Sequence, residues 1–207
     1  MQKISEGYFY EVYDLGSGRV LKKRRPFSKI LEDIRKKYKC GLFKGIIKTF
    51  DHIHECNNST YLIKERFKNI PLGLFGNPLF INNVEYKQDK TILLMDYFAN
   101  HDLEENKIMI DKYIELVKTL LKYSIHDRVY KFKNSYGIND KEEVVWIDFN
   151  EVTFSKEKTS EYAKNMEWKN ELQFKKFPEG ELKEYLNFKF SEALTPQNVD
   201  KLWGTMT

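Results

Sequence analysis

The chain has 207 residues, of which 41% are apolar and 32% are charged, so it is long enough for one compact domain or for two small lobes that share a cleft. Its 35 basic and 31 acidic side chains are interspersed, and the net charge of +4 does not indicate a nucleic-acid partner. No stretch approaches the run of about 20 apolar residues that a membrane span needs, and the first six residues lack the apolar core of a signal peptide, so we expect no membrane partner. Cys40 and Cys56 are the only cysteines, too few for a disulfide framework or a cysteine-rich zinc site, which favours a reducing, cytoplasmic environment.

The first part of the chain reads as a hairpin followed by a helix. Residues 7–13 are aromatic and favour a strand, 14–18 have the composition of a turn, and Arg19 to Lys22 begin a second strand. Ser28 is suited to cap a helix over about 28–39, because apolar residues then recur at helical spacing.

A second hairpin is predicted next. Residues 46–54 and 60–67 each alternate between apolar and polar side chains, and the segment 56–59 between them has turn residues. Residues 69–90 look irregular because glycine and proline are frequent at their start. The apolar stretch 91–98 fits either a strand or a short helix.

The later part of the chain is mostly helical. Apolar residues at three- and four-residue steps predict a long helix over about 105–125, and a hairpin follows with strands at 135–138 and 144–149. A threonine, a first-turn proline and a closing glycine predict a helix over 195–204. Strands first and mostly helices afterwards indicate an α+β fold.

The first hairpin carries residues that suit phosphate binding. The sequence from Ile4 to Tyr13 resembles the glycine-rich loop of protein kinases, Gly-x-Gly-x-x-Gly-x-Val, with its middle glycine kept as Gly7 and its valine as Val12. Ten residues after Val12, Lys22 resembles the kinase strand lysine that contacts nucleotide phosphates. A plain aromatic hairpin with a surface lysine is the alternative interpretation.

Two further small-lobe features follow from this resemblance. A helix would supply a glutamate that pairs with Lys22, and Glu32 is the candidate, with Asp33 next to it. The sequence 61–72 is similar to the last strand of the kinase small lobe running into the hinge, where Glu65 to Phe67 would present backbone groups to an adenine edge. An edge strand leading into a loop would give the same pattern.

The strongest motif lies at 144–150. An apolar strand delivers Asp148 and Phe149 at its end, which resembles the Asp-Phe-Gly motif with Asn150 in place of glycine. A carboxylate at the end of a buried strand is costly unless it meets a partner, and a magnesium ion bound to a nucleotide would be such a partner. A strand end with an exposed aspartate is the alternative.

The segment 125–134 resembles the catalytic loop His-x-Asp-x-x-x-x-Asn. Asp127 would be the base that orients the attacking hydroxyl, and Asn134 would be the second metal ligand. Six residues separate Asp127 from Asn134, whereas the family has four. If the loop bulges by two residues, both roles survive; if Asn134 keeps the family register, the base position falls on Val129 and the catalytic aspartate is absent.

The resemblance covers residues 4–154 and implies a bilobal kinase-like fold of the small, atypical or degenerate type found in bacteria and phages. It implies a β-rich small lobe over 1–68 and a reduced helical lobe over 69–207, with Lys22 and Asp148 converging on one nucleotide. The expected ligands are ATP and Mg²⁺. No element beyond Phe154 resembles an activation segment or the substrate platform of a full protein kinase.

Three functions remain open from the sequence. The first is a minimal kinase that transfers phosphate from Mg-ATP to a hydroxyl of an unidentified protein or small molecule. The second is a degenerate pseudokinase that acts as a binding or regulatory module. The third is a basic interaction protein that contacts nucleic acid through Lys22 to Arg25, although we expect nucleic acid to be an improbable partner.

Overall fold

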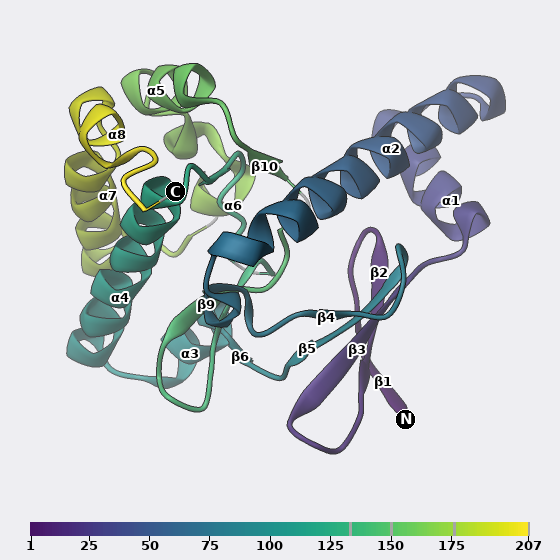
Figure 1. The fold of residues 1–207 in the computed structure, drawn as a ribbon, viewed down its shortest axis with the longest axis horizontal. Helices are drawn as coiled ribbons and strands as arrows, with labels where there is room; N and C mark the ends of the chain where they lie inside the picture. The colour runs from purple at the N-terminus through teal and green to yellow at the C-terminus, as the bar shows by residue number, and fades with distance from the viewer. Residues whose placement is uncertain (133, 150, 176, 207) are drawn as a thin grey trace. The chain divides into compact units, whose positions relative to one another are not determined.

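A computed structural model describes residues 1–132, 134–149, 151–175 and 177–206, with the backbone alone for 67, 172 and 173 (Figure 1). The chain divides into two compact units: unit 1 comprises Met1–Lys68 and Gly76–Lys90, and unit 2 comprises Asn69–Phe75 and Thr91–Thr207. The expected division after residue 68 is therefore one of three places where the chain passes between units, and 76–90 returns to unit 1.

Unit 1 contains a five-stranded antiparallel sheet. Its spatial order is β1-β2-β3-β5-β4. The strands are β1 (Gln2–Glu6), β2 (Tyr10–Asp14), β3 (Arg19–Arg24), β4 (Leu79–Phe80) and β5 (Glu85–Asp89). The predicted first strand over 7–13 is thus replaced by a loop at residues 7–9 and a shorter strand, β2, that begins at Tyr10.

Two helices complete unit 1 and correct the prediction of a second hairpin. Helix α1 (Phe27–Tyr38) agrees with the predicted helix, but 46–54 and 60–67 belong almost entirely to the single 25-residue helix α2 (Leu42–Arg66), which packs against α1. The buried residues of α2 recur at helical steps from Gly45 to Ile63. The predicted turn at 56–59 lies inside this helix.

The stretch 69–90, predicted to be irregular, contributes two strands to the sheet. Short 3₁₀ turns, η1 (Phe67–Asn69) and η2 (Leu72–Phe75), precede β4 and β5. Tyr86 and Gln88 on β5 are buried, and β5 is an interior strand of the sheet. The glycines and prolines at the start of this stretch favoured a prediction of irregular structure, although two strands follow them.

Unit 2 begins with a short strand and two helices. Both alternatives for 91–98 occur, since β6 (Ile92–Leu93) leads directly into α3 (Leu94–Asn100). The predicted long helix is confirmed as α4 (Leu103–Lys122), and a capping box between Asp102 and Glu105 fixes its start.

Two small sheets follow α4. The predicted hairpin is confirmed as β8 (Tyr136–Ile138) and β9 (Val144–Trp146), which form a sheet of order β6-β8-β9. Strand β7 (His126–Asp127), at the start of the candidate catalytic loop, pairs with β10 (Val152–Thr153). The pairing of β8 with β9 brings Ser135, just after that loop, next to the end of β9.

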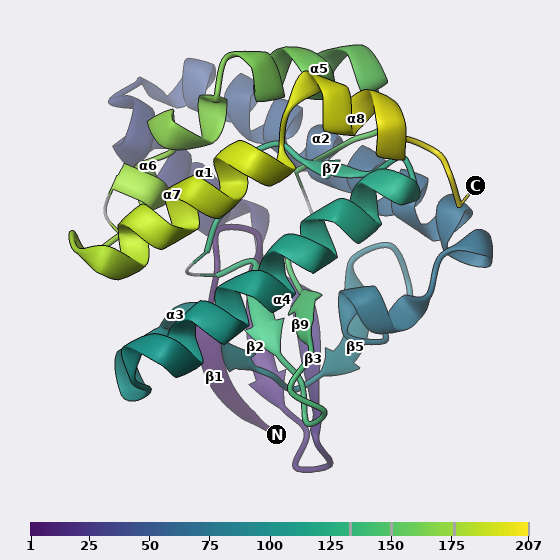
Figure 2. The ribbon, with the colours of Figure 1, turned by 90° about the vertical axis from the view of Figure 1, so that its left-hand side faces the viewer.

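The remaining helices of unit 2 follow β10. They are α5 (Lys156–Lys164), η3 (Glu167–Asn170), α6 (Leu172–Lys175), α7 (Glu181–Ala193) and α8 (Pro196–Leu202). Figure 2 shows α7 and α8 beside α4, in agreement with their contacts. The predicted C-terminal helix is confirmed, with Thr195 accepting a hydrogen bond from the amide of Asn198 as its cap.

The fold is therefore α+β, as the sequence predicted. Within the described part of the chain, no helix combines the length and apolar character required to cross a bilayer.

Candidate functional site

Val12 and Lys22, both predicted to contact nucleotide, lie side by side on the sheet of unit 1. They are directly paired residues of β2 and β3, and Lys22 is in turn paired with Tyr86 of β5. The Lys22 side chain is only 7% exposed, and its ammonium nitrogen lies 5.6 Å from the centre of the Tyr86 ring. The strand alternation thus places a largely buried cation beside an aliphatic side chain on one face of the sheet.

The loop that contains Gly7 is held by an arginine that the sequence did not single out. The buried Arg25 donates to the carbonyl oxygens of Gly7 (3.2 Å) and Tyr8 (3.1 Å). It also forms ion pairs with Glu6 (2.8 Å) and Asp33 (2.7 Å). Arg25 ends the basic run 22–25, which on sequence is one possible nucleic-acid contact, so no sequence signal separated Arg25 from its neighbours.

Gly7 itself is under no conformational demand for glycine. Its amide donates to the carbonyl of Tyr10 at 2.8 Å, which closes the loop between β1 and β2. A methyl group added at Gly7 would meet its nearest atom at 3.6 Å, an ordinary contact. A need for glycine here would therefore come from a ligand rather than from the fold.

The other predicted small-lobe residues do not have the surroundings that the resemblance implies. Glu32 is 64% exposed and pairs with Lys36 at 2.7 Å. Within α1 and α2, all of whose residues are described, no acidic side chain is buried. The extended hinge expected at 65–67 is wrong, because Glu65 lies in the last turn of α2 and Phe67 begins η1.

Asp148 and Asn134 lie on adjacent chain segments of unit 2. The carbonyl of Ser135 accepts hydrogen bonds from the amides of Ile147 (2.7 Å) and Asp148 (3.3 Å), which holds the end of β9 against the residue after Asn134. Asp148 is half-buried and Asn134 is exposed. Phe149, which follows, is fully buried.

Phe149 packs in an edge-on arrangement against Phe75, with ring centres 5.7 Å apart. This contact fixes the chain direction immediately after Asp148. Asn150, which the sequence resemblance sets against the glycine of an Asp-Phe-Gly motif, lies outside the described residues.

Asp127 is sequestered in the core of unit 2. It is paired with Val152 across β7 and β10 and is only 4% exposed. One carboxylate oxygen accepts from the hydroxyl of Tyr136 at 2.5 Å, and the other accepts from the amide of Val129 at 2.9 Å. Both oxygens are thus engaged inside the protein.

Burial dominates the electrostatics around Asp127. It raises the pKa of Asp127 to about 6 and that of Glu171 to about 7. For Lys131, burial acts to lower the pKa, but the charges of Glu151 and Asp148 outweigh it and the pKa is raised. Lys131 and Glu151 form an ion pair. Several carboxylates therefore share one cation in this part of unit 2.

Among the described residues, a magnesium ion would find only part of its coordination shell. The described residues contain no group of three or more His, Cys, Asp or Glu side chains able to hold a metal ion. Asp148 and Asn134 offer oxygen donors on neighbouring segments, which fits an ion that takes its remaining ligands from phosphates and water.

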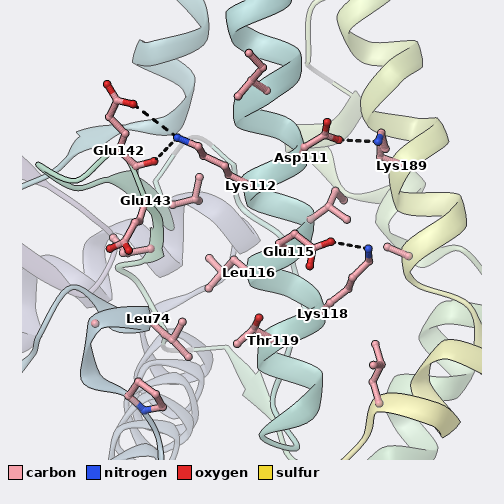
Figure 3. Close-up of a pocket in the computed structure, with 18 of the residues that line it drawn as sticks. Leu74, Asp111, Lys112, Glu115, Leu116, Lys118, Thr119, Glu142, Glu143 and Lys189 are labelled. Carbon is pink, nitrogen blue, oxygen red and sulfur yellow. Dashed lines mark hydrogen bonds and ion pairs between the residues drawn. The ribbon is translucent and has the colours of Figure 1, made fainter.

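A separate groove of about 1140 Å³ runs along α4 in unit 2 (Figure 3). Charged side chains along it are paired with one another: Asp111 with Lys189, Lys118 with Glu115, and Lys112 with Glu142. Among the described residues that line it, none is a residue that the sequence predicted for nucleotide, metal or catalysis.

Searches with protein-family models and among curated proteins found no match to this chain.

Proposed function

We propose that this protein is a degenerate kinase-like module that binds Mg-ATP and lacks the catalytic base for efficient phosphate transfer. The observation that carries the proposal is the pairing of Val12 with the largely buried Lys22 on the second and third strands of a sheet ordered β1-β2-β3-β5-β4. A lysine so placed is what nucleotide phosphates require in kinases. Gly7 closes the loop at the start of the same hairpin.

Asp148 and Asn134 are the residues that we propose for magnesium binding. The Asp148 carboxylate and the Asn134 side-chain oxygen would hold magnesium that arrives with the nucleotide. When bound, magnesium would neutralise phosphate charge. The protein's part is to hold a carboxylate and an amide oxygen on adjacent segments, through the hydrogen bonds of Ser135.

The position of Asp127 favours a degenerate protein. In the kinase pattern His-Arg-Asp-x-x-x-x-Asn, an asparagine at 134 aligns Arg128 with the arginine and Val129 with the base. Asp127 then falls at the histidine position, which agrees with its location in a buried strand pair. The Asp127 carboxylate is buried, and its oxygens already accept from Tyr136 and from the Val129 amide, so a substrate hydroxyl could not reach it without a rearrangement.

An active phosphotransferase is the second candidate. The pKa of Asp127, raised to about 6, lies in the range that suits a general base. In that case Asp127 would have to leave Tyr136 when substrate binds. The acceptor would be a hydroxyl of a protein or small molecule.

The nucleic-acid alternative loses its main support. Lys22 and Arg25 are buried, so within the run 22–25 they do not form a continuous basic surface with Lys23 and Arg24.

Calorimetric titration and thermal melting with Mg-ATP test nucleotide binding. The intact protein should gain about 2.7 kcal/mol at a nucleotide concentration of about 100 times its dissociation constant. Asp148→Asn should lose the magnesium-dependent part, whereas Asp140→Asn, in the neighbouring turn, should behave as the natural protein. An unchanged melting temperature at saturating Mg-ATP would refute the proposal.

Release of labelled phosphate separates the two candidates. The degenerate protein should show the same slow release in Asp127→Asn as in the natural sequence. Release that depends on Asp127, in a variant that still binds Mg-ATP, would establish the active enzyme instead.

A further inference from the structure

Helix α2 exposes an apolar stripe over its first turns. Phe43, Ile47 and Phe50 recur at steps of four and three residues and therefore lie on one face of the helix. They are 80%, 49% and 60% exposed, and Leu42 beside them is 56% exposed. Another face of this helix is already used, because Gly45 and Thr49 are buried. Large apolar side chains this exposed and this close together mark a contact surface.

The same region accounts for the net positive charge of the protein. Residues 27–48 contain seven basic and two acidic side chains, a net charge of +5, whereas the whole chain carries +4. The remaining residues therefore sum to −1. Positive charge that looked interspersed along the sequence is concentrated in α1 and the start of α2.

Four of these lysines are available to an outside partner. Within the described part of the chain, no acidic side chain forms an ion pair with Lys37, Lys39, Lys44 or Lys48. Lys37 and Lys48 both lie over the ring of Tyr38, at 5.3 and 4.4 Å from its centre. These four lysines, with Leu42, Phe43, Ile47 and Phe50, form what is called here the α1–α2 patch.

The composition of the α1–α2 patch favours a membrane surface over a protein as its negatively charged partner. Six of the seven basic residues in 27–48 are lysines. Protein interfaces favour arginine and are depleted in lysine, whereas helices that lie on membranes combine lysines with phenylalanine and leucine. Lys44 and Lys48 each follow an apolar residue of the stripe by one position, so their long side chains can reach headgroups while the apolar side chains enter the interface.

The acidic residues of α2 set the limit of the patch. Asp51 and Glu55 are exposed soon after Phe50 and would be repelled by an anionic surface. Contact is therefore confined to the first turns of the helix.

We propose that the α1–α2 patch binds the surface of an anionic lipid bilayer. The phenylalanines enter the boundary between headgroups and acyl chains, and the lysines contact the lipid phosphates and carboxylates. Such contact needs no spanning helix. It stands independently of nucleotide binding.

Cosedimentation of the full chain with vesicles tests the proposal. The protein should pellet with phosphatidylcholine vesicles that contain about 30% phosphatidylserine and stay in solution with pure phosphatidylcholine. Raising the salt concentration should release it, because screening shortens the reach of the lysine charges. Equal pelleting with both vesicles, or none with the anionic ones, would overturn the proposal.

Paired variants assign the binding to the patch. Lys39→Glu with Lys44→Glu should weaken association at least about 30-fold, since each lysine near an anionic surface contributes about fivefold. Phe43→Ser with Phe50→Ser should weaken it about tenfold or more. The matched controls are Lys158→Glu with Lys164→Glu, which change the charge equally on α5, and Phe188→Ser, which removes an exposed phenylalanine of α7. Loss of binding in the controls as well would refute the assignment.

A fluorescent reporter gives a readout that does not depend on charge. The three natural tryptophans, at 146, 168 and 203, all lie in unit 2. Phe43→Trp should show a blue-shifted emission with anionic vesicles and quenching by brominated acyl chains. Pelleting without quenching would mean that the patch does not enter the bilayer. Displacement from vesicles by a short RNA that binds equally well to the phenylalanine variants would identify a nucleic-acid surface instead.

Discussion

Replacing Asp127 with asparagine removes one negative charge from the core of unit 2 while keeping the shape of the side chain. The carboxylate is buried, accepts from Tyr136 at 2.5 Å and from the amide of Val129 at 2.9 Å, and shares its surroundings with Glu151 and Lys131. Burial raises its pKa from 3.8 to about 6. That change corresponds to roughly 3 kcal/mol of folding free energy linked to one proton.

The direction in which stability changes with pH follows from the raised pKa of Asp127. Between about pH 4 and pH 6 the folded protein binds the proton on Asp127 and the unfolded chain does not, so stability from this group is full below pH 4 and is lost as the pH rises through 6. The asparagine side chain of the variant would have no such dependence. Its amide oxygen can still accept a hydrogen bond from Tyr136. The hydrogen bond from the Val129 amide is lost, which lowers the free energy of unfolding by about 1 kcal/mol.

The Asp127→Asn variant should therefore be about 1 kcal/mol less stable than the natural protein at pH 4 and roughly 2 kcal/mol more stable at pH 7. Urea unfolding of both proteins between pH 4 and pH 7 gives the difference in their free energies of unfolding. Most other titrating groups contribute equally in the two proteins and cancel. Glu171 contributes in the same direction, since the loss of the Asp127 charge removes one cause of its raised pKa. A difference that stays constant with pH, or a variant several kcal/mol less stable at neutral pH, would refute the reasoning.

Three further outcomes test the geometry described above. Gly7→Ala should change the free energy of unfolding by less than about 0.5 kcal/mol, since its nearest neighbour would be 3.6 Å away, yet it should weaken Mg-ATP binding in calorimetry. Gly137→Ala should destabilise unit 2 by about 1–3 kcal/mol in urea unfolding, because the new methyl group would clash with the Thr91 hydroxyl oxygen. Arg25→Met should lower the free energy of unfolding by about 1–2 kcal/mol, because Asp33 and two loop carbonyls lose a donor, whereas an unchanged unfolding midpoint would show that the loop is held by other contacts.

Helix α4 was predictable because its apolar residues recur at helical steps, and the β8–β9 hairpin was predictable because a continuous apolar run follows turn residues. Helix α2 was not. Its outer face carries Phe43, Ile47 and Phe50, so apolar residues point both inward and outward and the helical period is blurred. Thr49 and Thr60 donate to carbonyls four residues earlier, which lets β-branched residues sit inside the helix where they suggest a strand.

The parts of the candidate site that lie on one hairpin or one strand could be predicted from the sequence. The hairpin alone places Val12 beside Lys22, and the apolar run before Asp148 predicts the strand that delivers it. The environment of Asp127 was not accessible in this way, because it depends on Tyr136 nine residues later and on the β7–β10 pairing. The choice between two loop registers needs those tertiary contacts.

The way the chain alternates between its two units has a consequence for evolution and for engineering. Unit 1 is discontinuous: β4 and β5 are encoded after the chain has already entered unit 2 and come back. A gene fragment that stops at Lys68 would leave β3 as a bare edge, open to intermolecular pairing. No single cut in the gene therefore separates unit 1 from all of unit 2.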